Sequence, residues 1–126
     1  MQKVVFNGHY LTYIDTAVAE YWRAIGLPYP DAYVARYAND IFLRKATVEY
    51  LGSARYDEEL DVLCRTARVG RSSLTFQFEI WRGVSDLLVT AELVYVNADL
   101  ASKASAPLPE DLRERIRRFE RTAPLQ

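Results

Sequence analysis

The sequence predicts a single α+β domain, and three observations lead to that class. Apolar residues recur with helical period over residues 10–25, four later segments alternate with a period of two, and a charged segment near the end resembles a short helix. With 126 residues the chain is long enough for one domain with a substantial core and too short for two ordinary ones. We therefore expect one domain over residues 1–126.

The helix predicted over Tyr10–Ile25 has apolar residues at steps of three and four and clear signals at both ends. Asn7 is a candidate N-cap, Gly26 is a candidate C-cap, and Pro28 follows as a stop. Because apolar residues also occupy its other faces, we expect the rest of the chain to wrap this helix. The connection over residues 27–39 contains two prolines and is expected to be irregular, with room for one short helical turn.

Four strands and a final helix are predicted after this connection. The first strand places Phe42, Ala46, Val48 and Tyr50 on one face and Leu43, Lys45, Thr47 and Glu49 on the other. The next three run over Leu60–Val69, Leu74–Trp81 and Leu87–Ala98, with a tight turn at Gly70 and Arg71. Pro109–Glu120 has proline at its start, acids in its first turn and arginines in its last, as the helix dipole favours.

Such a sheet covers only one side of a helix and leaves its own edge and outer face open. A second copy of the chain is the simplest cover for these surfaces. We therefore expect a homo-oligomer, at least a dimer.

Charge and composition argue against several classes of function. Sixteen basic and seventeen acidic residues give a net charge of -1, so no overall positive field exists to attract nucleic acid. The basic run Arg113–Arg121 includes Glu114 and Glu120, which favours a solvated helix face over a phosphate-binding patch. Cys64 alone provides neither a disulfide nor a metal site, and no apolar run is long enough for a membrane span. We expect a cytoplasmic protein without metal or cofactor.

The densest polar cluster lies at the start of the predicted helix, from Val4 to Asp15. Free backbone amides there, at Asn7 and Gly8, are suited to an oxyanion in acyl transfer, although Asn7 as a plain helix cap is the commoner role. His9 is a candidate general base, while a lone histidine in a turn is more often structural. Asp15, among apolar neighbours, is either a base of raised pKa or, more commonly, a carboxylate bonded to the backbone or an arginine.

Cys64 and the turn over residues 70–73 are two further candidates. Cys64 shares an apolar strand face with Leu60 and Val62, which favours a buried hydrophobe over a reactive thiol. The turn formed by Gly70, Arg71, Ser72 and Ser73 offers a guanidinium, two hydroxyls and free amides to a phosphate, a weak signal by itself. The common motifs of nucleotide binding, metalloproteases and serine hydrolases are absent.

Four segments resemble the 4-hydroxybenzoyl-CoA thioesterase-like group of hotdog proteins, in the expected order. They are VVFNGHYLTYIDTAVAEYWRAIG, ATVEYLGSARYDEELDV, VGRSSLTFQFEI and PLPEDLRERI. The resemblance implies the hotdog fold, a long central helix wrapped by an antiparallel sheet, with chains that dimerise side by side. It also implies hydrolysis of acyl-CoA thioesters to the free acid and CoA by a homodimer or homotetramer.

The same resemblance implies roles for particular residues. The Asn7 backbone N–H matches the group that polarises the thioester carbonyl. With the candidates already taken from the residues themselves, the expected catalytic set is Asn7, Gly8, His9 and Asp15. Residues 7–10 are expected to line a pocket at a subunit interface, together with Arg71 of the neighbouring chain. Residues 71–73 match a turn near the CoA phosphates and residues 55–57 a turn near the pantetheine channel. The implied substrate-binding residues are Tyr10, Arg55, Tyr56, Asp57, Arg71, Ser72 and Ser73.

One expected group is missing from the resemblance. The family places an aspartate four residues before the first valine of the Val-Val pair, which here would stand immediately before Met1. Either the natural start lies upstream or the chain is a degenerate member, and the apparent loss of a first strand as well favours the upstream start. Hydrolysis by the chain from Met1 is then expected to be weak, while acyl-CoA binding survives.

Two rival functions remain open from the sequence. A non-catalytic hotdog protein would bind acyl-CoA or another acyl ligand without turning it over. A cone-shaped ligand pocket of the nuclear-transport-factor type is less favoured, because such chains usually open with more than one helix.

Overall fold

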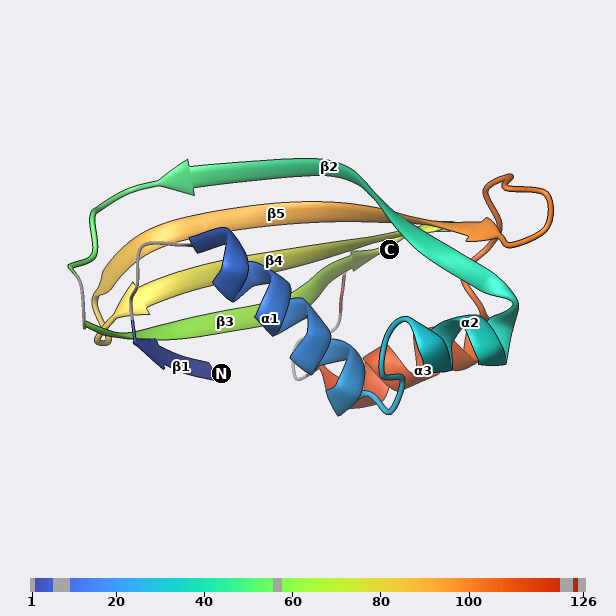
Figure 1. Ribbon diagram of the computed structural model, residues 1–126, viewed down its shortest axis with the longest axis horizontal. Helices are drawn as coiled ribbons and strands as arrows, with labels where there is room; N and C mark the ends of the chain where they lie inside the picture. Colours follow the sequence, from blue (N-terminus) through green and yellow to red (C-terminus); the bar gives the residue numbers. More distant parts are fainter. Residues whose placement is uncertain (1, 6–9, 56–57, 121–123, 125–126) are drawn as a thin grey trace.

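The computed structural model describes residues 2–5, 10–55, 58–120 and 124 as one antiparallel sheet curved around a long helix (Figure 1). The sheet has five strands in the order β1-β3-β4-β5-β2, and every neighbouring pair is antiparallel. The predicted α+β class is confirmed. The elements are β1 (Gln2–Val5), α1 (Tyr10–Ala24), α2 (Asp31–Tyr37), β2 (Asn39–Tyr50), β3 (Glu59–Val69), β4 (Ser73–Arg82), β5 (Asp86–Asp99) and α3 (Glu110–Phe119).

Strand β1 overturns the expectation that a first strand is missing. Gln2 lies opposite Val62 and Val5 lies opposite Glu59 at one edge of the sheet. Four residues are too few for a period-two argument, which explains why the sequence did not reveal this strand. Because β1 is so short, it covers only the first part of β3.

The core lies between the helix-facing side of the sheet and α1. In β4 the predicted alternation is confirmed, because Leu74, Phe76, Phe78 and Ile80 are all buried. Trp22 of α1 packs edge-on against Phe76, with ring centroids 5.9 Å apart. Burying an aromatic side chain of this size contributes roughly 1.5–3 kcal/mol, so these two rings are major anchors of the helix on the sheet.

The end of α1 is fixed by Gly26, as predicted. Gly26 has φ +85°, its N–H donates to the Arg23 carbonyl, and the Leu27 N–H donates to the Trp22 carbonyl. This pair of bonds is the Schellman cap, in which a positive φ favours glycine. The connection that follows contains α2, a seven-residue helix, where one short turn was expected.

A β-bulge at Arg44 overturns the predicted faces of β2. Leu43 pairs with Tyr95, whereas Lys45 pairs with Val94, so one residue is inserted between the two pairs. The insertion reverses the alternation, because a shift of one residue moves a side chain to the opposite face. Leu43 therefore shares the helix-facing side with the later residues, and Phe42 does not. The helix-facing residues of β2 beyond Ile41 are Leu43, Ala46, Val48 and Tyr50.

Asp111 joins α3 to α2, and Arg115 joins α3 to the end of α1. The Asp111 carboxylate accepts hydrogen bonds from the Tyr37 hydroxyl at 2.6 Å, and from Arg36 and Arg115 at 2.9 Å each. The Tyr37 bond and then the two arginines hold the pKa of Asp111 well below its usual range. Arg115 also donates to the carbonyl of Ile25, so one side chain links α3 to the end of α1.

Candidate active site

The first candidate region is the end of the sheet at which α1 begins. Tyr10 is the first residue of α1, and the pairing of Val5 with Glu59 places the preceding strand at the first residue of β3 (Figure 1). Asn7, Gly8 and His9 lie outside the described residues. Their expected roles, and that of Tyr10, stay predictions.

Asp15 lies on the second turn of α1, and its side chain is exposed. The expected apolar surroundings are therefore wrong, because Tyr13, Ile14 and Ala17 form the core face of this part of the helix. The charge of Asp15 nevertheless reaches the sheet. Burial raises the pKa of Tyr95 on β5, and the negative charge of Asp15 raises it further. Asp15 thus lies on the side of α1 that looks toward β5.

Along its β2 edge the sheet exposes apolar side chains, from Leu43, which pairs with Tyr95, to Tyr50. Leu43 is 54% exposed and Tyr50 is 60% exposed, although both point to the helix side of β2. Leu51, just beyond the strand, is exposed as well. In Figure 1 α1 lies across β3 and β4, and α2 lies at the start of β2, so no helix drawn there covers the second half of β2. We call Leu43, Ala46 and Tyr50 the β2 apolar face.

The loop over residues 51–58 lies at the same end of the sheet as the start of α1 (Figure 1). Arg55 and Glu58 close a turn within it, because the Glu58 N–H donates to the Arg55 carbonyl at 3.2 Å and the Arg55 N–H donates to the Glu58 carboxylate. The Arg55 bond lowers the pKa of Glu58, and Arg82 lowers it further. Tyr56 and Asp57 lie outside the described residues. Arg55 is exposed, and within the described ranges its guanidinium makes no ion pair.

The second candidate region, the turn over residues 70–73, lies at the opposite end of β3. The ten steps from Glu59 to Val69 span roughly 33 Å at the usual rise of a strand. Arg71 therefore cannot reach the start of α1 in its own chain. Any site that combines the two must take Arg71 from a neighbouring copy.

The Gly70 amide and the carbonyls of this turn are engaged in hydrogen bonds. The Gly70 N–H donates to the Ser73 carbonyl, while the carbonyls of Arg71 and Ser72 accept bonds from Leu108 and Asn97. Arg113 of α3 also donates to the carbonyls of Gly70 and Arg71, at 2.8 and 3.0 Å. The Arg71 side chain is exposed. A phosphate role for Arg71, Ser72 and Ser73 stays a prediction.

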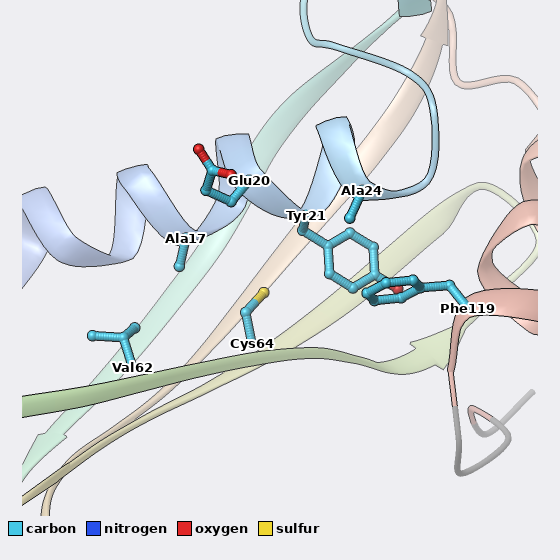
Figure 2. Close-up of a pocket in the computed structure, with 7 residues that line it drawn as sticks. All are labelled: Ala17, Glu20, Tyr21, Ala24, Val62, Cys64 and Phe119. Carbon is cyan, nitrogen blue, oxygen red and sulfur yellow. The ribbon is translucent and has the colours of Figure 1, made fainter. Parts of the chain in front are cut away.

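A cavity of about 280 Å³ lies between α1, the uncovered part of β3 and the end of α3 (Figure 2). Its lining residues are Ala17, Glu20, Tyr21, Ala24, Val62, Cys64 and Phe119. Figure 2 shows the Cys64 sulfur pointing into this space from β3. Burial raises the pKa of the Cys64 thiol, followed by the charge of Glu120, which favours the neutral form and fits the expected hydrophobic role.

One hydrogen-bond network beside this cavity was not foreseen from the sequence. The Tyr21 hydroxyl donates to Glu120 at 2.5 Å and accepts a bond from the Thr66 hydroxyl at 2.6 Å. The Thr66 N–H donates to the same Glu120 oxygen at 2.9 Å. Burial, and then the Glu120 bond, raise the pKa of Tyr21. The residues are far apart in sequence, so no local pattern could have indicated the network.

Within the described residues, no three His, Cys, Asp or Glu side chains lie close enough together to hold a metal ion. Among the helices described, none is both long and apolar enough to cross a membrane.

Several solved structures share this architecture. A thioesterase from Thermus thermophilus, solved with coenzyme A and zinc, is 25% identical, with TM-score 0.70 and coverage of 92% of this chain and 91% of that one. A 1,4-dihydroxy-2-naphthoyl-CoA thioesterase from Synechocystis is 19% identical, with TM-score 0.76 and coverage of 94% and 87%. A Staphylococcus aureus protein solved in complex with CoA is 14% identical, with TM-score 0.81 and coverage of 99% and 85%. A search of curated protein sequences finds no match.

A long helix wrapped by a five-stranded sheet in the order β1-β3-β4-β5-β2 defines a hotdog-fold chain. The model of the Thioesterase superfamily matches residues 2–96, about three quarters of the sequence. The chain therefore belongs to the Thioesterase superfamily. The resemblance noted in the sequence is confirmed at the level of family and fold.

Proposed function

We propose that this protein hydrolyses acyl-CoA thioesters to a free acid and CoA. The observation that carries the proposal is the family match over residues 2–96. Two similar structures that were solved with CoA support it, since they show that chains of this fold hold this carrier.

The proposed chemistry is placed at the end of the sheet where α1 begins. Backbone amides of Asn7 and Gly8 would hold the negative charge that develops on the thioester oxygen. A base removes a proton from water, the hydroxide attacks the carbonyl carbon, the carbon–sulfur bond breaks, and the CoA thiolate takes up a proton. Asp15, exposed on the second turn of α1, is the candidate base, and His9 is the alternative base.

The proposed assembly is a homodimer in which a second copy covers the β2 apolar face. Strand β2 is an edge strand of twelve residues, so its outer backbone groups are also open to pairing. A neighbouring copy would bring its own 70–73 turn within reach of the first chain. This would supply Arg71, Ser72 and Ser73 to the CoA phosphates, while Arg55 and its loop flank the pantetheine arm.

The test is a thioester-cleavage assay with detection of the free thiol, using benzoyl-CoA and a short aliphatic acyl-CoA. If Asp15 is the base, Asp15→Asn should lower kcat about 100-fold to 10,000-fold with little change in KM. Glu20→Gln is the matched control, because Glu20 is another exposed carboxylate on α1, paired with Arg23. If Asp15→Asn is as active as the parent, Asp15 is not the base. His9→Gln then tests His9 as the base.

The second candidate function is binding without turnover. It is favoured if the parent chain releases no thiol from either substrate yet binds acyl-CoA in calorimetry. Absence of both turnover and binding would contradict the proposed function.

A further inference from the structure

Arg82, the last residue of β4, is bonded to two separate segments of the chain. Its Nε and Nη2 donate to Asp86 at 3.0 and 2.8 Å, within the same hairpin. Its Nη1 donates to both carboxylate oxygens of Glu58, at 3.0 and 3.1 Å, and to the Ser53 carbonyl at 3.3 Å. The forked guanidinium can serve two carboxylates at once, which an ammonium group does less well.

The contact between Arg82 and Glu58 ties the loop that precedes β3 to the end of β4. Leu51, Gly52 and Ser53 are all exposed, and Ala54 is the residue of this loop that packs against the core. The Leu51 and Gly52 amides bond to the Leu88 carbonyl where the loop leaves β2. At the other end of the loop, the connection to the sheet is made by Glu58 and Arg82.

The same carboxylate also shapes the turn that carries Arg55. Glu58 accepts the Arg55 N–H while it binds Arg82, so the backbone of Arg55 is tied to β4 through one side chain. The Arg55 side chain is exposed beside the end of the sheet where α1 begins.

We propose that Arg82 is a positioning residue for substrate: through Glu58 and Ser53 it holds the described part of this loop, residues 51–55 and 58, in place and so presents Arg55 to the CoA moiety. This inference rests on the proposed function. Arg82 itself is occupied by Glu58 and Asp86, so it acts on substrate only through the loop. The two contacts of Arg82 can be tested separately by mutation. Asp86 lies within the β4–β5 hairpin, whereas Glu58 belongs to the loop.

The experiment compares Glu58→Gln, Arg82→Gln and the double variant with Asp86→Asn as the matched control. Glu58→Gln and Arg82→Gln should each raise KM for acyl-CoA about three- to tenfold with kcat within about twofold, the factor expected from one partly exposed charged contact. The double variant should match the single ones, because both changes break the same contact. Asp86→Asn should leave KM unchanged.

A second readout does not depend on substrate. Trypsin cleavage after Arg55, followed by mass spectrometry on the folded protein, reports local opening of the loop. Glu58→Gln should be cleaved there about three- to tenfold faster than Asp86→Asn and the parent. Unchanged cleavage in Glu58→Gln would overturn the claim that Arg82 holds the loop.

The two measurements test separate claims, namely that Arg82 holds the loop and that the loop presents Arg55 to substrate. Faster cleavage with unchanged KM would overturn the role in presenting substrate, and a change in kcat alone would do the same. If the parent neither hydrolyses nor binds acyl-CoA, the proposed function fails and the role in substrate binding fails with it. The cleavage rates then still decide whether Arg82 holds the loop.

Discussion

The two ends of the sheet are built in different ways. At the end with α2 and α3, the Asn97 side chain is buried, accepts the Tyr33 hydroxyl at 2.7 Å and donates to the carbonyls of Ala106 and Pro107. At the other end, Tyr50 and Leu51 are more than half exposed. At the first end, the polar groups of Asn97 are paired and Tyr33 is fully buried. The second keeps apolar surface open, which is where we place association and chemistry.

The largest expected effect is on the free energy of unfolding. It compares a buried residue of β4 with an exposed residue of the edge strand β2. Phe76→Ala should lower the free energy of unfolding by about 3–5 kcal/mol, because Phe76 is buried against Trp22. Phe42→Ala is the comparison, since Phe42 is 49% exposed on the outer side of β2, and it should cost less than about 1 kcal/mol. Urea unfolding at one fixed protein concentration measures both. A larger, concentration-dependent cost for Phe42→Ala would show that a second copy covers it.

The next effect concerns assembly. Leu43→Asp places a charge in the β2 apolar face and should raise the dissociation constant of the dimer at least about tenfold, or about 1.4 kcal/mol. Val84→Asp is the control, because Val84 is 99% exposed in the β4–β5 turn, away from that face. Sedimentation or light scattering over a dilution series measures the change. A well-folded monomer at micromolar concentration for the parent would contradict the proposed dimer.

The smallest effect concerns pH at the closed end. The pKa of Asp111 is lowered in the folded state, so its stabilisation is present above the unfolded value of about 3.9 and is lost as the pH falls below it. Because Asp111 is partly exposed, the contribution should be at most about 1 kcal/mol. Asp111→Asn should be less stable than the parent at pH 7, and the difference should shrink below pH 4. A difference that stays constant between pH 7 and pH 3 would contradict this account.

The sequence predicted those features that depend on local spacing. The helix ending at Gly26 and the alternation in β4 were both found, because each is specified within a few residues. The bulge at Arg44 was not predicted, because inserting one residue changes the pairing without any local signature. As a result Phe42 was assigned to the wrong face.

The candidate site was less predictable than the fold. Arg55 and Arg71 were singled out through resemblance, but the contact of Glu58 with Arg82 joins residues that are 24 positions apart. Such pairs depend on which strands become neighbours, and periodicity does not contain that information. The exposure of Asp15 was also missed, because apolar neighbours in the sequence lie on other faces of the helix.

The two edges of the sheet differ in how much of their backbone is open to pairing, and this difference affects how many chains can associate. At one edge, β1 covers the first part of β3, and the Glu120 carboxylate takes the Thr66 N–H at a position where a further strand would place a carbonyl. At the other edge, β2 is long and uncovered. In the proposed dimer, two chains joined through β2 would each turn the short, partly capped β1 edge outward. Such an edge offers a further chain little to pair with, which would favour a closed pair over a growing fibre.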